Sequence, residues 1–351
     1  TMFYGDLFRN TAQNAQIQLR PEGRNAFYKW IHDSLAANKP YNNMAGELIT
    51  ARGDNSFDQS NGQINYLALG VVNGGPVQDI FDQQTANVAT QFLGMAHVNC
   101  ILCHSGRGHL DSLSLWGKGA TRTQAWGLSA FMSHTSVVAK SLPTDPNVAN
   151  PPIIRYWALG TLTTDYNLNT TTGNRPSRQP VGTLRVITPT YLGGQVPAKG
   201  QDYRQSLAQL ITTDRQFARA AVNYIWAAMF GMGIVDPPDQ FDPARLDPSN
   251  PPPDPWKLQP SNPALLEALT QWFIDNKYDI RGLMRLIANS DTYQLASEYN
   301  GNWDPTWNQH FARKMVRRLW AEELHDSVVT ATGMVPTYTV PGFSNASTVY
   351  G

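Results

Sequence analysis

Apolar residues recur every three to four positions through most of the chain, a spacing that predicts amphipathic helices. Between residues 24 and 37 the apolar positions are Phe27, Trp30, Ile31 and Leu35. Similar patterns predict helices over residues 42–51, from just after 74–76, and over 203–212, 216–230, 262–276, 280–293 and 309–332. The expected fold class is therefore mainly α.

Less regular stretches divide these helices into two groups. Residues 143–200 are rich in proline and threonine and hold short β-like runs at 153–157 and 184–187. Polar residues 53–63 and the Pro/Asp-rich residues 236–260 are typical of surface loops. The acidic residues of the second loop, Asp236, Asp239 and Asp242, lack the spacing of a calcium loop and are expected to be solvated.

The most distinctive motif is Cys100-Ile101-Leu102-Cys103-His104, which holds the chain's two cysteines. Two thiols three positions apart at a helix end lie on nearly one face, with an imidazole next to them. This is the Cys-x-x-Cys-His pattern of c-type haem attachment. The sequence therefore predicts one haem c, bound covalently through Cys100 and Cys103, with His104 as the proximal iron ligand.

Three other interpretations of the two thiols stay open. A thioredoxin-like dithiol normally follows a strand and opens a helix, whereas the residues before Cys100 have a helical pattern. A structural zinc site needs four ligands, which His97, His104 or His109 would have to complete. A plain disulfide is the third interpretation.

A second axial ligand to the haem iron would come from a flanking segment. His109, His134 and Met95 are the candidate distal ligands, and Met132 and His97 also lie near in sequence. A histidine pair would give a lower potential than histidine with methionine. Apolar residues that could cover a porphyrin, or serve as ordinary core, are Leu113, Leu115, Trp116, Trp126 and Phe131.

Composition narrows the range of partners. The 351 residues include 27 basic and 27 acidic side chains, and charged residues make up only 15%. This balance gives no electrostatic reason to expect nucleic acid or an anionic membrane as a partner, and no apolar run is long enough to span a bilayer. The neutral surface rich in Asn, Gln, Thr and Ser is typical of an exported protein, periplasmic or at the cell surface. Because no charged leader begins the chain, we expect it to be a mature product or a fragment.

Longer motifs point to a family. They are Trp30-Ile31-His32, Phe92-Leu93-Gly94 before the cysteines, residues 126–131 and 188–194, and, in the second half, residues 217–226, 230–239 and 317–324. In these the chain resembles proteins first described from planctomycete genomes, in which a cytochrome-like domain (PSCyt type) precedes a companion domain of unassigned function (PSD type). The resemblance supports His109 as a second ligand, although residues 105–108 separate it from His104 here.

The expected organisation is a cytochrome c-like haem-attachment domain over residues 1–142, a linking region over 143–200 and a helical companion domain over 201–351. The expected function is electron transfer by an exported cytochrome rather than catalysis, with an unknown redox partner protein. The alternative is a structural or interaction module of an extracellular assembly, in which the haem only stabilises the fold; an enzyme with an open iron site is a third class. A compact subunit of this length has a diameter of about 50 Å and would carry one haem. If the protein self-assembles into a filament, we therefore expect the haems of neighbouring subunits to be isolated from one another.

Overall fold

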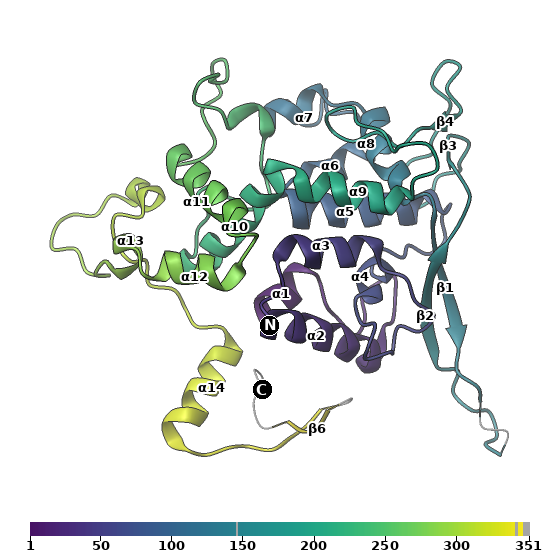
Figure 1. The fold of residues 1–351 in the computed structure, drawn as a ribbon, viewed down its shortest axis with the longest axis horizontal. Helices are drawn as coiled ribbons and strands as arrows, with labels where there is room; N and C mark the ends of the chain where they lie inside the picture. The colour runs from purple at the N-terminus through teal and green to yellow at the C-terminus, as the bar shows by residue number, and fades with distance from the viewer. Residues whose placement is uncertain (145–146, 341–342, 347–351) are drawn as a thin grey trace.

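The computed structural model of the chain describes residues 1–144, 147–340 and 343–346 (Figure 1). Its described residues are mainly helical, which confirms the predicted fold class. The helices of the first half are α1 (Met2–Leu7), α2 (Arg20–Ala36), α3 (Tyr41–Thr50), α4 (Ile64–Ala68), α5 (Gln78–Leu93), α6 (His97–Ile101), α7 (Leu115–Gly119) and α8 (Arg122–Ser129), followed by the 3-10 turn η1 (Ala130–Met132). Those of the second half are α9 (Tyr203–Thr213), α10 (Arg215–Phe230), α11 (Pro263–Asp275), α12 (Ile280–Ala288), α13 (Asp291–Gln294) and α14 (Ala321–Thr332), with the 3-10 turns η2 (Pro243–Arg245) and η3 (Pro305–His310).

Helix α5 lies at the centre and packs against α6 and α8 of its own half and against α10 of the second half (Figure 1). The helix carries an apolar face and buries most of its length, including Phe81, Val88 and Phe92. It ends at Gly94, whose φ of 64° is left-handed, a conformation that glycine adopts without steric cost. The turn at Gly94 lets the chain reverse into α6, which carries Cys100.

The two halves share one core. Tyr41 at the start of α3 stacks on Phe217 of α10 with 5.1 Å between ring centroids, and both side chains are buried. The buried guanidinium of Arg204 in α9 donates to the carbonyl oxygen of Ala51, 2.6 Å away, at the end of α3. Burial, and then the positive charge of Arg52, lower the pKa of Arg204 to about 10. Aromatic stacking and a cation at a helix C-terminus therefore join the first half to the second.

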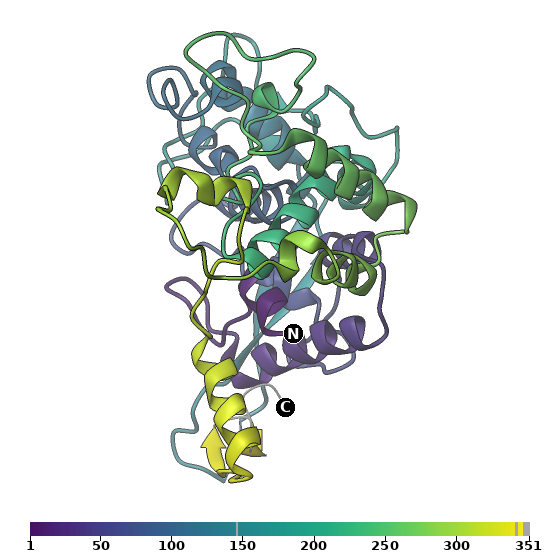
Figure 2. The same ribbon diagram turned by 90° about the vertical axis from the view of Figure 1, so that its left-hand side faces the viewer.

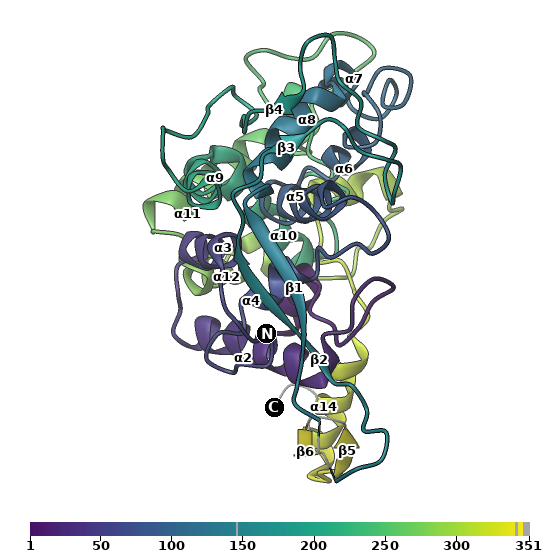
Figure 3. The same ribbon diagram turned by 90° about the vertical axis from the view of Figure 1, so that its right-hand side faces the viewer.

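A β-hairpin runs along one face of the molecule, and Figure 3 shows it in front of the helices. Strand β1 (Thr135–Ser141) pairs antiparallel with β2 (Arg155–Thr161), with Thr135 opposite Thr161. The run predicted at 153–157 is therefore a strand, although it begins and ends later than expected. Two smaller pairs follow: β3 (Tyr166–Asn167) with β4 (Val186–Ile187), and β5 (Tyr338–Val340) with β6 (Phe343–Ala346).

Two predicted helices of the second half are wrong in extent. The helix expected over 280–293 is divided, because Ser290 accepts a hydrogen bond from the backbone N–H of Tyr293 and starts a new helix there. The helix expected over 309–332 begins only at residue 321. Before it, Phe311 packs at 5.3 Å from Phe230, and the Lys314 ammonium lies 3.1 Å from the Tyr293 ring centroid. These tertiary contacts keep residues 312–320 out of a helix and override the helical periodicity.

Helix α14 lies apart from the other helices in both Figures 1 and 2. None of its residues is buried. Its start nevertheless lies close enough to α1 for the carboxylate of Glu322 to help raise the pKa of Asp6. Across the described residues, no helix is both long and apolar enough to cross a bilayer.

Asp6 gives a prediction for stability against pH. Partial burial, and then the Glu322 carboxylate, raise the pKa of Asp6. Ionisation of Asp6 in the folded protein therefore lowers the free energy of unfolding. This loss of stability is absent below the unfolded carboxyl pKa of about 3.9 and is complete above the folded pKa. We expect Asp6→Asn to raise the thermal unfolding midpoint at pH 7 and to match the wild type near about pH 3. Paired melting curves at the two pH values measure both effects.

Asp33→Asn is the matched control. Hydrogen bonds from Lys29 and His32 lower the pKa of Asp33, so the same substitution there should give no gain at pH 7. An Asp6→Asn protein that melts below the wild type at pH 7 would contradict the explanation.

Candidate functional site

The cysteines lie in one helical turn. Cys100 is in the last turn of α6 and is exposed, and Cys103 follows the helix end and is half-buried. The backbone N–H groups of Cys103 and His104 both donate to the carbonyl oxygen of Cys100 at 3.1 Å. The turn therefore continues the helix past Ile101 and keeps both thiols on one side, as the spacing predicts.

A buried cation contacts the second thiol. Arg175, which is 3% exposed, donates from Nη1 to the Sγ of Cys103 at 3.2 Å. The same guanidinium donates to the backbone carbonyl and side-chain amide oxygens of Asn99, at 3.2 and 2.7 Å. Arg175 is thus held by the residue just before the motif, with one N–H directed at sulfur.

Arg122 supports the turn from the other direction. Its Nε donates to the carbonyl oxygen of Leu102 at 3.0 Å, and its Nη1 donates to that of Ser177 at 2.9 Å. The guanidinium lies 4.7 Å from the centroid of the Trp126 ring. Partial burial, and then the charge of Arg178, lower the pKa of Arg122. Arg122 thereby fixes the backbone between the cysteines against residues 176–177.

Behind Arg175 lies a fully buried ionic network. Arg178 donates from Nη2 to Asp79 at 2.7 Å and to Asp82 at 2.6 Å, and none of these side chains is exposed. Tyr166 and Ser129 donate their hydroxyls to the same oxygen of Asp82, at 2.8 and 2.6 Å. Burial opposes the charge on Arg178, but Asp82 and Tyr166 together hold its pKa above the ordinary value. The network joins residues 166–178 to α5 and keeps Arg175 at the cysteines.

The loop after His104 is compact. The rings of His104 and His109 stack with 4.6 Å between centroids, and both are exposed. Gly106 lies against α7 so closely that a Cβ would meet the Gly117 carbonyl oxygen at 1.7 Å. His109 therefore lies directly against His104, through a turn that needs glycine at position 106.

Asp242 reaches this loop from the second half. Its carboxylate accepts hydrogen bonds from the N–H groups of Leu115 and Trp116, at 2.6 and 3.0 Å, at the start of α7. Asp242 is only 1% exposed, so the expectation of a solvated acidic loop is wrong for this residue. A buried carboxylate here stabilises the N–H groups of the helix end, which have no acceptor within the helix.

The other candidate ligands lie elsewhere. Met95 is buried and pairs through its backbone with Gln240. His134 stacks on Tyr203 of α9 with 4.0 Å between centroids. His97 is buried at the start of α6, and burial lowers its pKa. The structure therefore brings only His109, of the predicted distal ligands, beside His104.

The haem c prediction is wrong. The described part of the chain has no group of three or more His, Cys, Asp and Glu side chains that could hold a metal ion. The surroundings of the motif agree, because the Sγ of Cys103 contacts the buried guanidinium of Arg175 rather than an open apolar surface. The same finding removes the zinc interpretation.

The apolar residues predicted to cover a porphyrin do not form one surface. Phe131 and Trp126 are core residues, whereas Leu113 is 59% exposed. A cavity of about 310 Å³ lies beside α6 and is lined by Val98, Ile101 and Trp116 among others. Neither cysteine nor His104 lines it. The apolar residues are therefore ordinary core and surface.

The sequence reasoning missed Arg175 and Arg178. They lie in a region of few charges, residues 143–200, and their acidic partners Asp79 and Asp82 are three positions apart in the apolar pattern that predicts α5. Two carboxylates in a buried helix need paired cations. This requirement could have indicated that buried arginines contact Asp79 and Asp82, although it does not identify which arginines they are.

Comparison with known proteins identifies the two halves. Residues 1–111 match the family model PSCyt2, a protein of unknown function (DUF1549), and residues 203–347 match PSD1, a protein of unknown function (DUF1553). No curated protein matches the chain. No solved structure matches it either. The family predicted from the motifs is confirmed: the chain belongs to the proteins in which a PSCyt2 domain is followed by a PSD1 domain.

Proposed function

We propose that the protein is an exported thiol–disulfide electron carrier, in which Cys100 and Cys103 alternate between two thiols and one disulfide. The observation that carries this proposal is the hydrogen bond from buried Arg175 to the Sγ of Cys103. Electron transfer, the function expected from the motif, is kept in this proposal without the haem. The thiols follow helix α5 and not a strand, so the site is no thioredoxin fold.

Backbone geometry supports closure of a disulfide. The i to i+3 hydrogen bond between Cys100 and Cys103 brings the Cα atoms of such a turn within about 7 Å. Disulfides join residues whose Cα atoms are about 4.4–6.8 Å apart. Rotation of the two side chains and a small adjustment of the turn are then enough to join the sulfurs.

The chemistry is a two-electron exchange with a partner that carries a disulfide. Exposed Cys100, as thiolate, attacks one sulfur of the partner disulfide, and a mixed disulfide forms while the other partner sulfur leaves as thiolate. Cys103 then attacks the Sγ of Cys100 and releases the partner's second thiolate. The protein loses two electrons and two protons, and the partner gains both.

Arg175 acts on the reduced state. Its N–H donor meets the sulfur of Cys103, and a cationic donor stabilises the negative charge of a thiolate. This contact favours the dithiol form over the disulfide. Arg175 is therefore a positioning and electrostatic residue, while the two sulfurs carry the reaction.

The test is a redox titration with dithiothreitol, followed by alkylation and intact mass. We expect a reversible two-electron transition in the wild type and none in Cys100→Ser. Arg175→Met should lower the midpoint potential by about 30 mV, equal to a tenfold change in the equilibrium constant. Arg107→Met, a change of an exposed arginine in the adjacent loop, is the control and should leave the midpoint unchanged. A dithiol that cannot be reversibly oxidised, or an Arg175→Met midpoint equal to the wild type, would sink the proposal.

A second function, as an interaction module of an extracellular assembly, is favoured by one surface. Apolar side chains around α14 are largely exposed, among them Val316 at 84% and Leu324 at 55%. A surface with several exposed apolar side chains close together is typical of a protein–protein contact surface. Concentration-dependent self-association that Leu324→Glu abolishes would support this function, and a monomer at all concentrations would exclude self-assembly through α14.

A further inference from the structure

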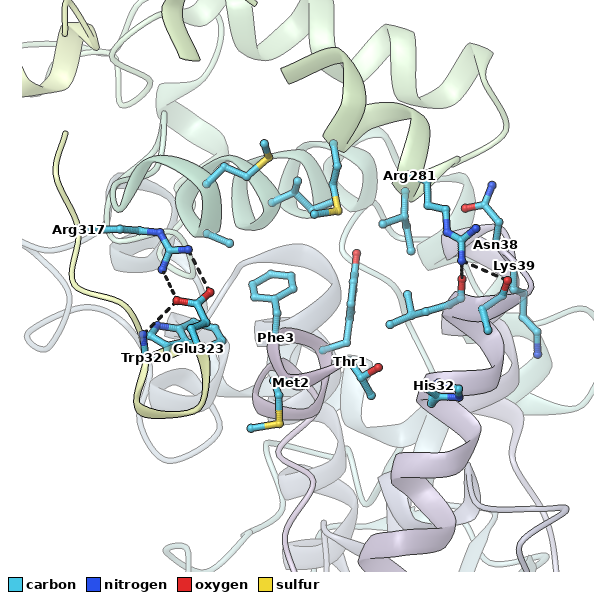
Figure 4. Close-up of a pocket in the computed structure, with 18 of the residues that line it drawn as sticks. Thr1, Met2, Phe3, His32, Asn38, Lys39, Arg281, Arg317, Trp320 and Glu323 are labelled. Atoms are coloured by element: carbon cyan, nitrogen blue, oxygen red, sulfur yellow. Dashed lines mark hydrogen bonds and ion pairs between the residues drawn. The ribbon is translucent and has the colours of Figure 1, made fainter. Parts of the chain in front are cut away.

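A cavity of about 580 Å³ lies between the two family domains. It is open to solvent on one side and is lined by α1 and α2 of the first half and by α10, α12 and the start of α14 of the second. Figure 4 shows Phe3 in the middle, with Arg317, Trp320 and Glu323 on one side and Arg281 on the other. The volume lies in the range of about 300–1,000 Å³ that small-molecule sites occupy.

Most of the lining is apolar and adaptable. Three methionines, Met2, Met229 and Met284, contribute to it with the aromatic side chains of Phe3 and Tyr4. Methionine is unbranched and fits apolar ligands of varied shape. The centre of the cavity therefore suits a flexible hydrocarbon better than a polar molecule.

The charged residues of the lining differ in what they contact. Lys39 donates to both carboxylate oxygens of Glu47, at 2.9 and 2.6 Å, and Arg317 donates to both oxygens of Glu323 at 3.1 Å. Arg281, in contrast, makes no ion pair within the described residues. Its Nη2 donates to the carbonyl oxygens of Leu35 and Ala36, at 2.9 and 3.2 Å.

These contacts leave a cation available at one side of an apolar cavity. A guanidinium has five N–H donors, and the two bonds of Arg281 use only one of its nitrogens. The bonds also fix the group at the end of α2, so a ligand need not order it. A carboxylate accepts two parallel hydrogen bonds from such a group.

We infer that the cavity binds an acyl-chain carboxylate, with the carboxylate on Arg281 and the chain along Phe3 toward Met229. The ligand would contact both family domains at once. This binding site is separate from the cysteines and does not depend on the proposed electron transfer.

The test uses calorimetric titration of the full chain with decanoate, and with decanol as the uncharged molecule of equal chain length. We expect saturable binding of decanoate at one site. Arg281→Gln should weaken decanoate by roughly tenfold or more and leave decanol nearly unchanged. Arg285→Gln, a change of an exposed arginine on the same helix that does not line the cavity, should bind decanoate like the wild type.

Two variants fill the cavity. Ala228→Trp places a large side chain in it from α10, and Met284→Trp does so from a position that is 45% exposed. Either should abolish binding of both molecules, and the second keeps the test valid if the first does not fold. Absence of saturable decanoate binding to the wild type, equal affinity in Arg281→Gln, or unchanged binding in a folded filled variant would overturn the inference.

Discussion

Arg178→Met is expected to lower the free energy of unfolding by about 3–5 kcal/mol, the cost of removing one partner of a buried ion pair. The substitution leaves the carboxylates of Asp79 and Asp82, neither of which is exposed, without the guanidinium that they share. Arg175 cannot replace it, because its Nε lies 3.8 Å from Asp82 and its other nitrogens already donate to Asn99. Chemical denaturation of the purified variant measures the loss.

Two controls separate charge from size. Arg185→Met removes an exposed arginine whose only described side-chain bonds are to the backbone oxygens of Gly182 and Leu184, and it should change the unfolding free energy by less than about 0.5 kcal/mol. Adding Asp79→Asn and Asp82→Asn to Arg178→Met should recover part of the loss, because the two buried carboxylates no longer carry unpaired negative charge. An Arg178→Met protein as stable as the wild type would show that the network contributes little.

Phe217→Ala is expected to cost about 3–5 kcal/mol, the range for truncating a buried aromatic side chain. Phe217 is fully buried and contacts Tyr41 at 5.1 Å and Phe92 at 6.2 Å between ring centroids. Both partners belong to the first half. The substitution therefore opens a cavity where the two family domains meet, and we expect both domains to lose stability together.

Hydrogen exchange distinguishes a shared core from two independent ones. Amides of α5 and of α11 should lose protection by the same free energy in Phe217→Ala. Leu286→Ala, at a position that is 39% exposed, should leave both nearly unchanged. Full protection of α5 together with loss in α11 would show that the domains unfold separately.

Most helices could be predicted because their stability comes from apolar faces that the periodicity reveals. Helices α2, α3, α9, α10 and α11 begin and end within a few residues of the expected positions. The errors have tertiary causes. Phe311 and Lys314 gain more from contacts with α10 and Tyr293 than from a helix, and no local pattern contains those contacts. Strand β1 was missed for the same reason, since its partner is β2, some twenty residues later.

The candidate site was predicted in part. Spacing alone places Cys100 and Cys103 in one turn, and glycines at 106 and 108 allow His109 to return to His104. The cofactor prediction failed because a motif shows only which residues are adjacent in sequence. It does not show which residues from elsewhere in the chain contact them in the folded protein. Arg175 comes from more than seventy residues later and meets the sulfur only in the folded chain.

The cap that Asp242 places on α7 has a consequence during protein synthesis. Chains emerge from the ribosome N-terminus first, so the cysteine turn emerges well before residues 175 and 242. Until then, α7 lacks the acceptor for its first N–H groups, and the thiols lack their guanidinium. In a nascent chain arrested before residue 175, Cys103 therefore lacks its contact with Arg175, and the cysteine turn has only its local backbone hydrogen bonds.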